Sequence, residues 1–390
     1  MNSGDSQATV QEPSVLRCPP LSIVDLDGAD AEAILNNLTT NRVQEMPVGD
    51  VVETFLTNVK GKCIGHVMAY RTATGFRLIG AGGQSQAITD LLDRYTIRED
   101  AVPTIRDQQT EAWVVVSQMK PPADGEQGDR QPAWWQASDE PKPFRFYRVP
   151  WLDGSPSGES TTDEGSRETC QTWLCLAEGQ EAAPGAAPDQ VGAVIGRYFD
   201  GLPEPSGWAD SHAFHTARVA AGFPWYGVDF NDAHLPQEVN RNESTLCFTK
   251  GCYLGQETVA RLDALGQVQK QIVAWYLQDL PGDERPPVDT KLFPVSDDHT
   301  GPITDSRISL EGKPVGRLTS VVAAEKPSTA VALGFARRSH FDPGAVAVGE
   351  LASGVRFRAT VRALVRTTFS EKGVGLSRDG GENASSRPQE

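Results

Sequence analysis

The spacing of apolar and polar residues predicts a mixture of helices and strands in the first part of the chain. Apolar residues recur at helical spacing after Asp30 and again after Ser85, and each of these two polar residues suits an N-cap. Between the two predicted helices, the patterns at 51–59, 63–71 and 76–80 indicate strands joined by glycine-containing turns. A helix, a meander of strands and a second helix together indicate an α+β subdomain.

Strand patterns dominate the end of the chain, whereas its middle is rich in loops. Between 119 and 190 the composition shifts to Pro, Gly, Ser and acidic residues, interrupted by strand-like runs at 144–149 and 172–176. A helix capped by its first residue is predicted over 211–222. From 271 to 369, β-rich segments alternate with turns, which predicts a small barrel.

These patterns divide the chain into five parts. Polar residues without periodicity predict disordered tails at 1–14 and 370–390. Two α+β subdomains are expected at 15–118 and 119–270, the second with a loop-rich insertion, and the barrel follows them.

Composition and charge narrow the classes of partner. The chain has 390 residues and a formal net charge of -16, which argues against binding nucleic acid or anionic membranes. It contains no run of about 18 apolar residues and no apolar segment of the signal-peptide kind at its start. We therefore expect a cytoplasmic protein.

The cysteines do not form a pattern typical of a disulfide scaffold or a metal site. Six cysteines in 390 residues are too few for a disulfide framework. Cys170 and Cys175 are separated by four residues, as are Cys247 and Cys252, but no histidines or closely spaced second pair reinforce either of them. We therefore expect no metal site.

The segment Lys250–Glu257, with the sequence KGCYLGQE, combines a thiol, an amine, an amide and a carboxylate in one glycine-containing turn. Alternation over 244–249 predicts a strand before it, and helical spacing up to Gly266 predicts a helix after it. Lys250 and the free N–H groups at the helix start would favour a thiolate at Cys252. Alternatively, an isolated cysteine of this kind is a small buried hydrophobic residue.

This segment closely resembles the K-G-C-[FY]-x-G-Q-E signature of the folate-binding YgfZ-type proteins. These proteins form a branch of the superfamily of the glycine-cleavage T-protein, an aminomethyltransferase. Further blocks resemble the same family in the same order, namely 56–62, 221–230, 235–238 and 315–320. The resemblance implies a T-protein-like α+β fold: two α+β subdomains and a C-terminal β-barrel around a central folate pocket.

The resemblance also implies a ligand, tetrahydrofolate or a one-carbon derivative, and a role in assembling or repairing iron–sulfur clusters in client proteins. Cys252 would be the functional thiol, assisted by Lys250. A site for reduced folate needs a carboxylate for the pterin edge, apolar or aromatic walls for the ring and a cation for the glutamate tail. The candidates are Asp229 or Glu257 for the pterin edge, Trp225 or Tyr226 for the ring, and Lys250 or Arg261 for the tail, with Gln256 in the same segment.

Two other functions are open. In T-proteins, an acidic pair in the first-subdomain hairpin serves the reaction, but Gly65 and His66 occupy the matching places here. An aminomethyltransferase or methyltransferase activity is therefore disfavoured. If the chain had such an activity, His66 could act as a replacement base; alternatively, His66 is a packing residue. A folate sensor without chemistry is the third hypothesis.

Overall fold

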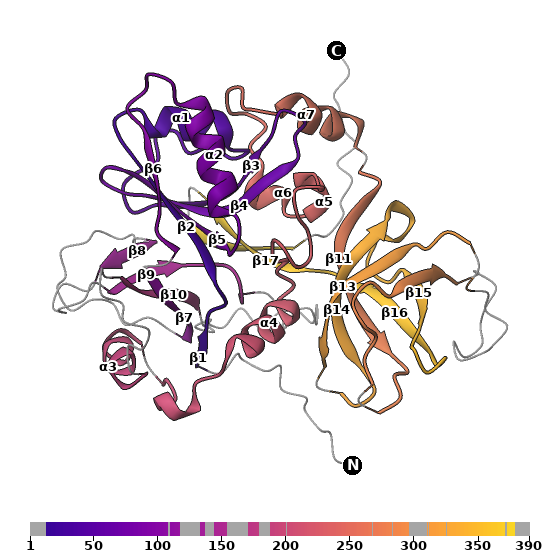
Figure 1. Ribbon diagram of the computed structural model, residues 1–390. Helices are drawn as coiled ribbons and strands as arrows, with labels where there is room; N and C mark the ends of the chain where they lie inside the picture. Colours follow the sequence, from indigo (N-terminus) through magenta and orange to yellow (C-terminus); the bar gives the residue numbers. More distant parts are fainter. Residues whose placement is uncertain are drawn as a thin grey trace.

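The computed structural model describes residues 13–107, 110–117, 133–136, 144–153, 171–178, 188–199, 201–266, 268–282, 284–295, 310, 312–324, 326–370 and 373–378. The described part contains two five-stranded sheets and one closed barrel, with the barrel to the right in Figure 1. Cys170 and the segment 307–309 of one expected strand lie outside the described residues.

The first sheet is antiparallel and has the strand order β3-β4-β5-β2-β6. Its elements are β2 (Leu21–Asp27), α1 (Ala31–Leu38), β3 (Val51–Thr57), β4 (Cys63–Arg71), β5 (Gly75–Ala81), α2 (Ser85–Tyr95) and β6 (Val102–Ile105). Both helices pack on one face of the sheet, where their apolar stripes meet Val67, Ala69 and Leu78. The predicted helices and strands are confirmed, but Gln84 occupies the N-cap position of α2, and the Asp30 side chain makes no capping hydrogen bond.

The second sheet has the strand order β1-β7-β10-β9-β8. Its strands are β1 (Ser14–Arg17), β7 (Thr110–Ser117), β8 (Trp134–Gln136), β9 (Phe144–Arg148) and β10 (Gln171–Glu178), and the helix α3 (Pro188–Tyr198) packs against it. The Trp134 indole donates a hydrogen bond of 3.0 Å to the Arg71 carbonyl and stacks on Tyr147. Trp134 is therefore a packing residue that joins the two sheets.

The C-terminal part forms a closed six-stranded barrel, as the strand patterns predict. Its strands are β11 (Lys270–Gln278), β12 (Lys291–Pro294), β13 (Gly316–Ala323), β14 (Ala330–Arg337), β15 (Val346–Glu350) and β16 (Arg356–Arg362), with a short η3 (Arg338–His340). Trp275, Leu292 and Phe357 fill its interior. A hairpin of β17 (Val365–Ser370) and β18 (Gly373–Arg378) follows and enters the segment whose composition predicts a disordered tail.

Short helices connect the sheets with the barrel. They are η2 (Pro205–Gly207), α4 (Ser211–Ala220), α5 (Pro236–Val239), α6 (Asn242–Thr245) and α7 (Gln256–Leu265). Helix α4 is capped by Asp210, whose side chain accepts a hydrogen bond of 3.0 Å from the Ala213 N–H, and not by Ser211. Helix α7 ends at Gly266 in the left-handed conformation, as its sequence predicts.

The predicted strand over 244–249 is wrong. Residues 242–245 form the single turn of α6, in which the Leu246 N–H donates to the Asn242 carbonyl and the Thr245 hydroxyl to the Arg241 carbonyl. One turn of helix is too short to show its own periodicity, so the alternation is accidental. The KGCYLGQE segment therefore connects two helices. In the described part of the chain, no helix is both long and apolar enough to cross a membrane.

Candidate functional site

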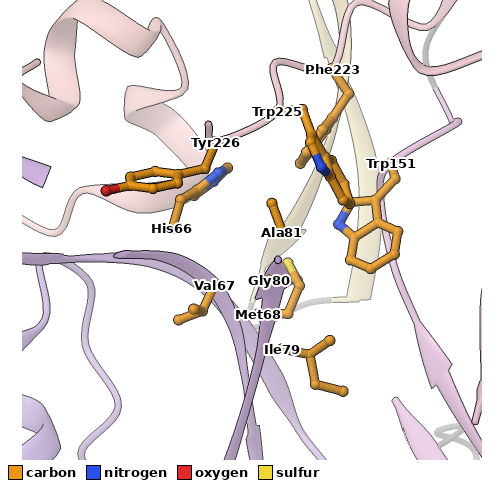
Figure 2. Close-up of a pocket in the computed structure, with 10 residues that line it drawn as sticks. All are labelled: His66, Val67, Met68, Ile79, Gly80, Ala81, Trp151, Phe223, Trp225 and Tyr226. Carbon is orange, nitrogen blue, oxygen red and sulfur yellow. The ribbon is translucent and has the colours of Figure 1, made fainter. Parts of the chain in front are cut away.

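A pocket lies where strands β4 and β5 of the first sheet meet the turn that follows α4. The space along its lining is about 240 Å³ when open solvent is included, and its enclosed part is about 10 Å³, roughly the room for one water molecule. Figure 2 shows His66 and Tyr226 on one side and the aromatic rings of Trp151, Phe223 and Trp225 on the other. The complete lining is His66, Val67, Met68, Ile79, Gly80, Ala81, Trp151, Phe223, Trp225 and Tyr226.

The turn after α4 holds the aromatic wall in place. The Trp225 carbonyl accepts hydrogen bonds from the N–H groups of Val228 and Asp229, and Gly227 adopts a φ of 81° that suits glycine. The Trp225 ring is buried and meets Trp151 edge to face at 5.1 Å. Trp225 and Tyr226, both expected at the ligand, therefore line this pocket.

His66 is an ionisable side chain in the pocket wall, and it lies between aromatic rings. Its imidazole stacks on Phe55 with 4.6 Å between ring centroids and lies nearly parallel to Phe223 at 5.9 Å. Its backbone N–H donates to the Gln84 side chain at 2.7 Å. The ring is 7% exposed, so its orientation is fixed by packing.

Behind His66 lies a buried ion pair that sequence reasoning missed. His66 Nε2 is 2.7 Å from Glu53 Oε1, and the Arg241 guanidinium donates to both oxygens of the same carboxylate. Burial alone would raise the pKa of Glu53, but the charge and hydrogen bonds of Arg241, together with the His66 hydrogen bond, lower it to about 2. Glu53 is therefore a carboxylate anion at neutral pH, and Arg241 also covers the Phe223 ring at 4.5 Å.

Gly65 faces away from this pocket. A Cβ atom at this position would come within 2.9 Å of the Ile88 side chain of α2. Successive strand residues alternate between faces, so Gly65 points toward the helices and His66 toward the pocket. A carboxylate at 65 would be buried in the apolar layer between sheet and helix.

Asp229 is not available to a pterin, in contrast to the expectation. It is 2% exposed, and its carboxylate forms an ion pair with Arg218 of α4. Its Oδ1 accepts hydrogen bonds from the Thr319 hydroxyl at 2.6 Å and the Ser320 hydroxyl at 2.7 Å, and its Oδ2 accepts the Trp225 N–H at 2.9 Å. Asp229 therefore connects the aromatic turn to α4 and to strand β13 of the barrel.

Lys250 does not act on Cys252 or on a ligand tail in this structure. Its ammonium group donates three hydrogen bonds of 2.7 Å, to the carbonyls of Asn36, Thr39 and Asn41 at the end of α1. Burial lowers the pKa of Lys250 to about 7. The side chain thus fixes the KGCYLGQE segment to the first subdomain, because those carbonyls need donors.

Cys252 lies exposed, three residues before Gly255, which is the N-cap residue of α7. It is therefore not at the N–H groups of the helix start. Burial tends to raise the pKa of its neighbour Cys247, but hydrogen bonds from Thr249 and from the Lys250 backbone outweigh burial and lower it. Among the described residues, no cluster of three His, Cys, Asp or Glu side chains is placed to hold a metal ion.

The remaining expected site residues are on α7. Gln256 accepts a hydrogen bond of 3.3 Å from the Tyr253 N–H and so closes the turn before the helix. Glu257 and Arg261 are exposed, and the lining of the described pocket includes no residue of α7. Gly255 is required for packing, since a Cβ there would lie 2.4 Å from the Asn58 carbonyl oxygen.

The sequence contains a pattern that could have placed Glu53 near His66, but it contains none that could have placed Arg241 or Trp151 at the pocket. Alternation along 51–59 places Glu53 on the same strand face as Phe55, and hairpin pairing sets Phe55 opposite His66. Arg241 lies 188 positions from Glu53, so only the fold brings the two together.

Sequence comparisons match short stretches of this chain to known proteins. No protein-family model matches the chain. A stretch of 56 residues is 40% identical to the tRNA-modifying protein YgfZ of Colwellia psychrerythraea, covering 14% of this chain and 17% of that protein. A stretch of 71 residues is 34% identical to an uncharacterized protein of Haemophilus influenzae, covering 18% and 25% respectively. The alignments thus span at most a quarter of the length of these relatives.

The fold is similar to that of a solved T-protein. The crystal structure of glycine cleavage system aminomethyltransferase T from Bartonella henselae superposes with a TM-score of 0.64 at 14% identity, covering 90% of this chain and 86% of that one. At this identity the likeness establishes the fold alone. The α+β architecture with a closed C-terminal barrel is confirmed.

Proposed function

We propose that this chain, which has the T-protein fold and a short stretch of YgfZ-type sequence, binds tetrahydrofolate or a one-carbon derivative in the pocket beside His66. The observation that supports this most strongly is the aromatic wall of Trp151, Phe223 and Trp225 facing an imidazole across the pocket. Flat heterocycles bind in clefts with apolar and aromatic walls and few polar groups.

The aromatic wall, and not an enclosed volume, is the feature of the pocket that suits the ring end of such a ligand. The pterin would lie against the aromatic wall at the open side of the pocket, and the glutamate tail would extend toward solvent. Trp225 and Tyr226 would contact the ring, while Lys250 is excluded as the tail cation because its ammonium is bound to three carbonyls.

Folate binding is tested by calorimetry with reduced folates and the full-length protein. A saturable binding heat that weakens in Trp225→Ala supports the proposal. Trp208→Ala is a matched control, because Trp208 is partly buried and packs against the second sheet. Absence of binding heat with several reduced folates would reject the proposal.

Aminomethyl transfer is not part of the proposed function. Gly65 points into the layer under α2, and the nearest carboxylate behind the pocket wall, Glu53, is occupied by Arg241 and His66. Absence of a positioned general acid or base typically costs about 10²–10⁴ in rate. In a reconstituted glycine-cleavage assay we expect no methylene-tetrahydrofolate above background, and robust formation would contradict this reading.

We also propose that the protein supports iron–sulfur client enzymes through the exposed thiol of Cys252. The name of the Colwellia relative connects that protein with tRNA modification. An effect of this chain on tRNA would be indirect, through a client enzyme, because a net charge of -16 disfavours contact with a polyanion.

The client role is tested in cells that lack the endogenous protein. The activity of iron–sulfur enzymes should recover with the wild-type chain and with Cys247→Ser, but not with Cys252→Ser. Full recovery with Cys252→Ser would exclude a thiol function and favour a folate sensor.

A further inference from the structure

The wall of the pocket contains one nitrogen atom with a free lone pair. Within the described part of the chain, His66 Nδ1 makes no hydrogen bond, whereas Nε2 is bound to Glu53. Nδ1 is not fully buried, so it keeps access to the pocket that His66 lines. In Figure 2 the Tyr226 hydroxyl points away from Trp225 and Trp151, leaving the imidazole closer to the centre.

The Glu53–Arg241 pair determines which nitrogen carries the proton. A carboxylate anion only accepts hydrogen bonds, so His66 Nε2 must donate to it. A neutral imidazole has a single N–H, and the other nitrogen then carries the lone pair. In the neutral ring Nδ1 is consequently an acceptor, and the double hydrogen bond from Arg241 keeps the Glu53 carboxylate charged and oriented.

The position of this acceptor is rigid. Phe55 and Phe223 hold the imidazole from its two faces, and Arg241 covers the outer face of Phe223. Phe55, His66 and Phe223 are all buried, so rotation of the imidazole is disfavoured. Preorganised polar groups of this kind give binding sites their specificity.

We propose that His66 is the specificity-determining contact of the pocket, accepting a hydrogen bond at Nδ1 from an N–H group of a flat heterocyclic ligand, and that Glu53 is its positioning residue. The assignment rests on the proposed folate function and deepens it. It predicts preference for ring systems that present an N–H donor at their edge over those that present only acceptors.

Ligand binding by matched variants tests the first half of the proposal. His66→Phe keeps a stacking ring and removes the acceptor, and His212→Phe is the control because His212 is exposed on α4. We expect the Kd of 5-formyltetrahydrofolate to rise about five- to tenfold in His66→Phe, the usual net effect of one hydrogen bond, and to be unchanged in the control. Wild-type binding with an unchanged Kd in His66→Phe overturns the His66 assignment and leaves folate binding intact. No binding by the wild-type protein overturns both.

The tautomer of His66 tests the second half of the proposal, and it is read first on the ligand-free wild-type protein. With ¹⁵N-labelled histidine, six side chains contribute signals, and His66→Phe identifies the relevant one. We expect a protonated Nε2 and an unprotonated Nδ1, whose shift moves when the ligand is added. Glu53→Gln should mix the two tautomers, whereas Glu257→Gln should not. A protonated Nδ1 in the neutral wild-type ring overturns the proposal.

Discussion

Replacing Glu53 with Gln should destabilise the protein in a manner that depends on pH. Glu53 is 1% exposed and carries hydrogen bonds from Arg241 and His66. The amide cannot balance the Arg241 charge, and Arg241 is itself 4% exposed. Removing one partner of a buried ion pair typically costs about 3–5 kcal/mol. We expect a loss of that size in the free energy of unfolding at pH 7.

Acid should narrow the difference in the free energy of unfolding between the wild-type protein and Glu53→Gln. The pKa of Glu53 is lowered from 4.5 to about 2 in the folded state. A carboxyl group with a depressed folded pKa stabilises the protein above its unfolded pKa and loses this contribution as pH falls through the folded value. The difference between these two pKa values corresponds to about 3 kcal/mol of stability, at about 1.4 kcal/mol for each pKa unit. The gap between wild type and Glu53→Gln should therefore narrow by about 3 kcal/mol between pH 4.5 and 2.

Urea unfolding followed by tryptophan fluorescence across this pH range measures the gap. Glu257→Gln is the control, since Glu257 is exposed on α7 and the substitution should change little at any pH. A constant gap from pH 7 to 2 would show that Glu53 is not held as a buried anion. The account of the His66 tautomer would then lose its basis.

Two further predictions concern the barrel contact and the thiols. Asp229→Asn should lower the free energy of unfolding by about 3–5 kcal/mol, because it leaves the Arg218 charge unpaired between α4 and the barrel. An unchanged midpoint of urea unfolding would refute this role of Asp229. A limiting alkylating reagent should modify Cys252 well before Cys63 and Cys18. The latter two are buried, and burial raises the pKa of their thiols. Mass spectrometry that shows either of them labelled first would contradict the structure.

Much of the fold is predictable from periodicity, because its long elements bury one face. Helices α1 and α2, the strands between them and the barrel follow the apolar pattern, and Gly266 marks the end of α7. The strand predicted over 244–249 fails because a one-turn helix has no detectable period. Capping by Ser85 and Ser211 fails because in each case the preceding residue occupies the cap position.

The chemistry of the site is predictable only in part, because a residue's neighbours decide its role. Trp225 and Tyr226 line the described pocket, whereas Asp229 and Lys250 are occupied by buried partners distant in sequence. His66, which reads in the sequence as a packing histidine, becomes the polar group of the pocket once Glu53 is placed behind it.

Calorimetric titration of the full-length protein with tetrahydrofolate and 5-formyltetrahydrofolate tests the central claim most directly. The account predicts saturable binding that is weakened at least about fivefold by Trp225→Ala, because stacking on a buried aromatic wall contributes about 1 kcal/mol or more beyond area burial. It also predicts a normal affinity for Cys252→Ser, whose exposed thiol lies outside the pocket lining. Binding that is absent from the wild-type protein, or that is lost in Cys252→Ser and retained in Trp225→Ala, would contradict it.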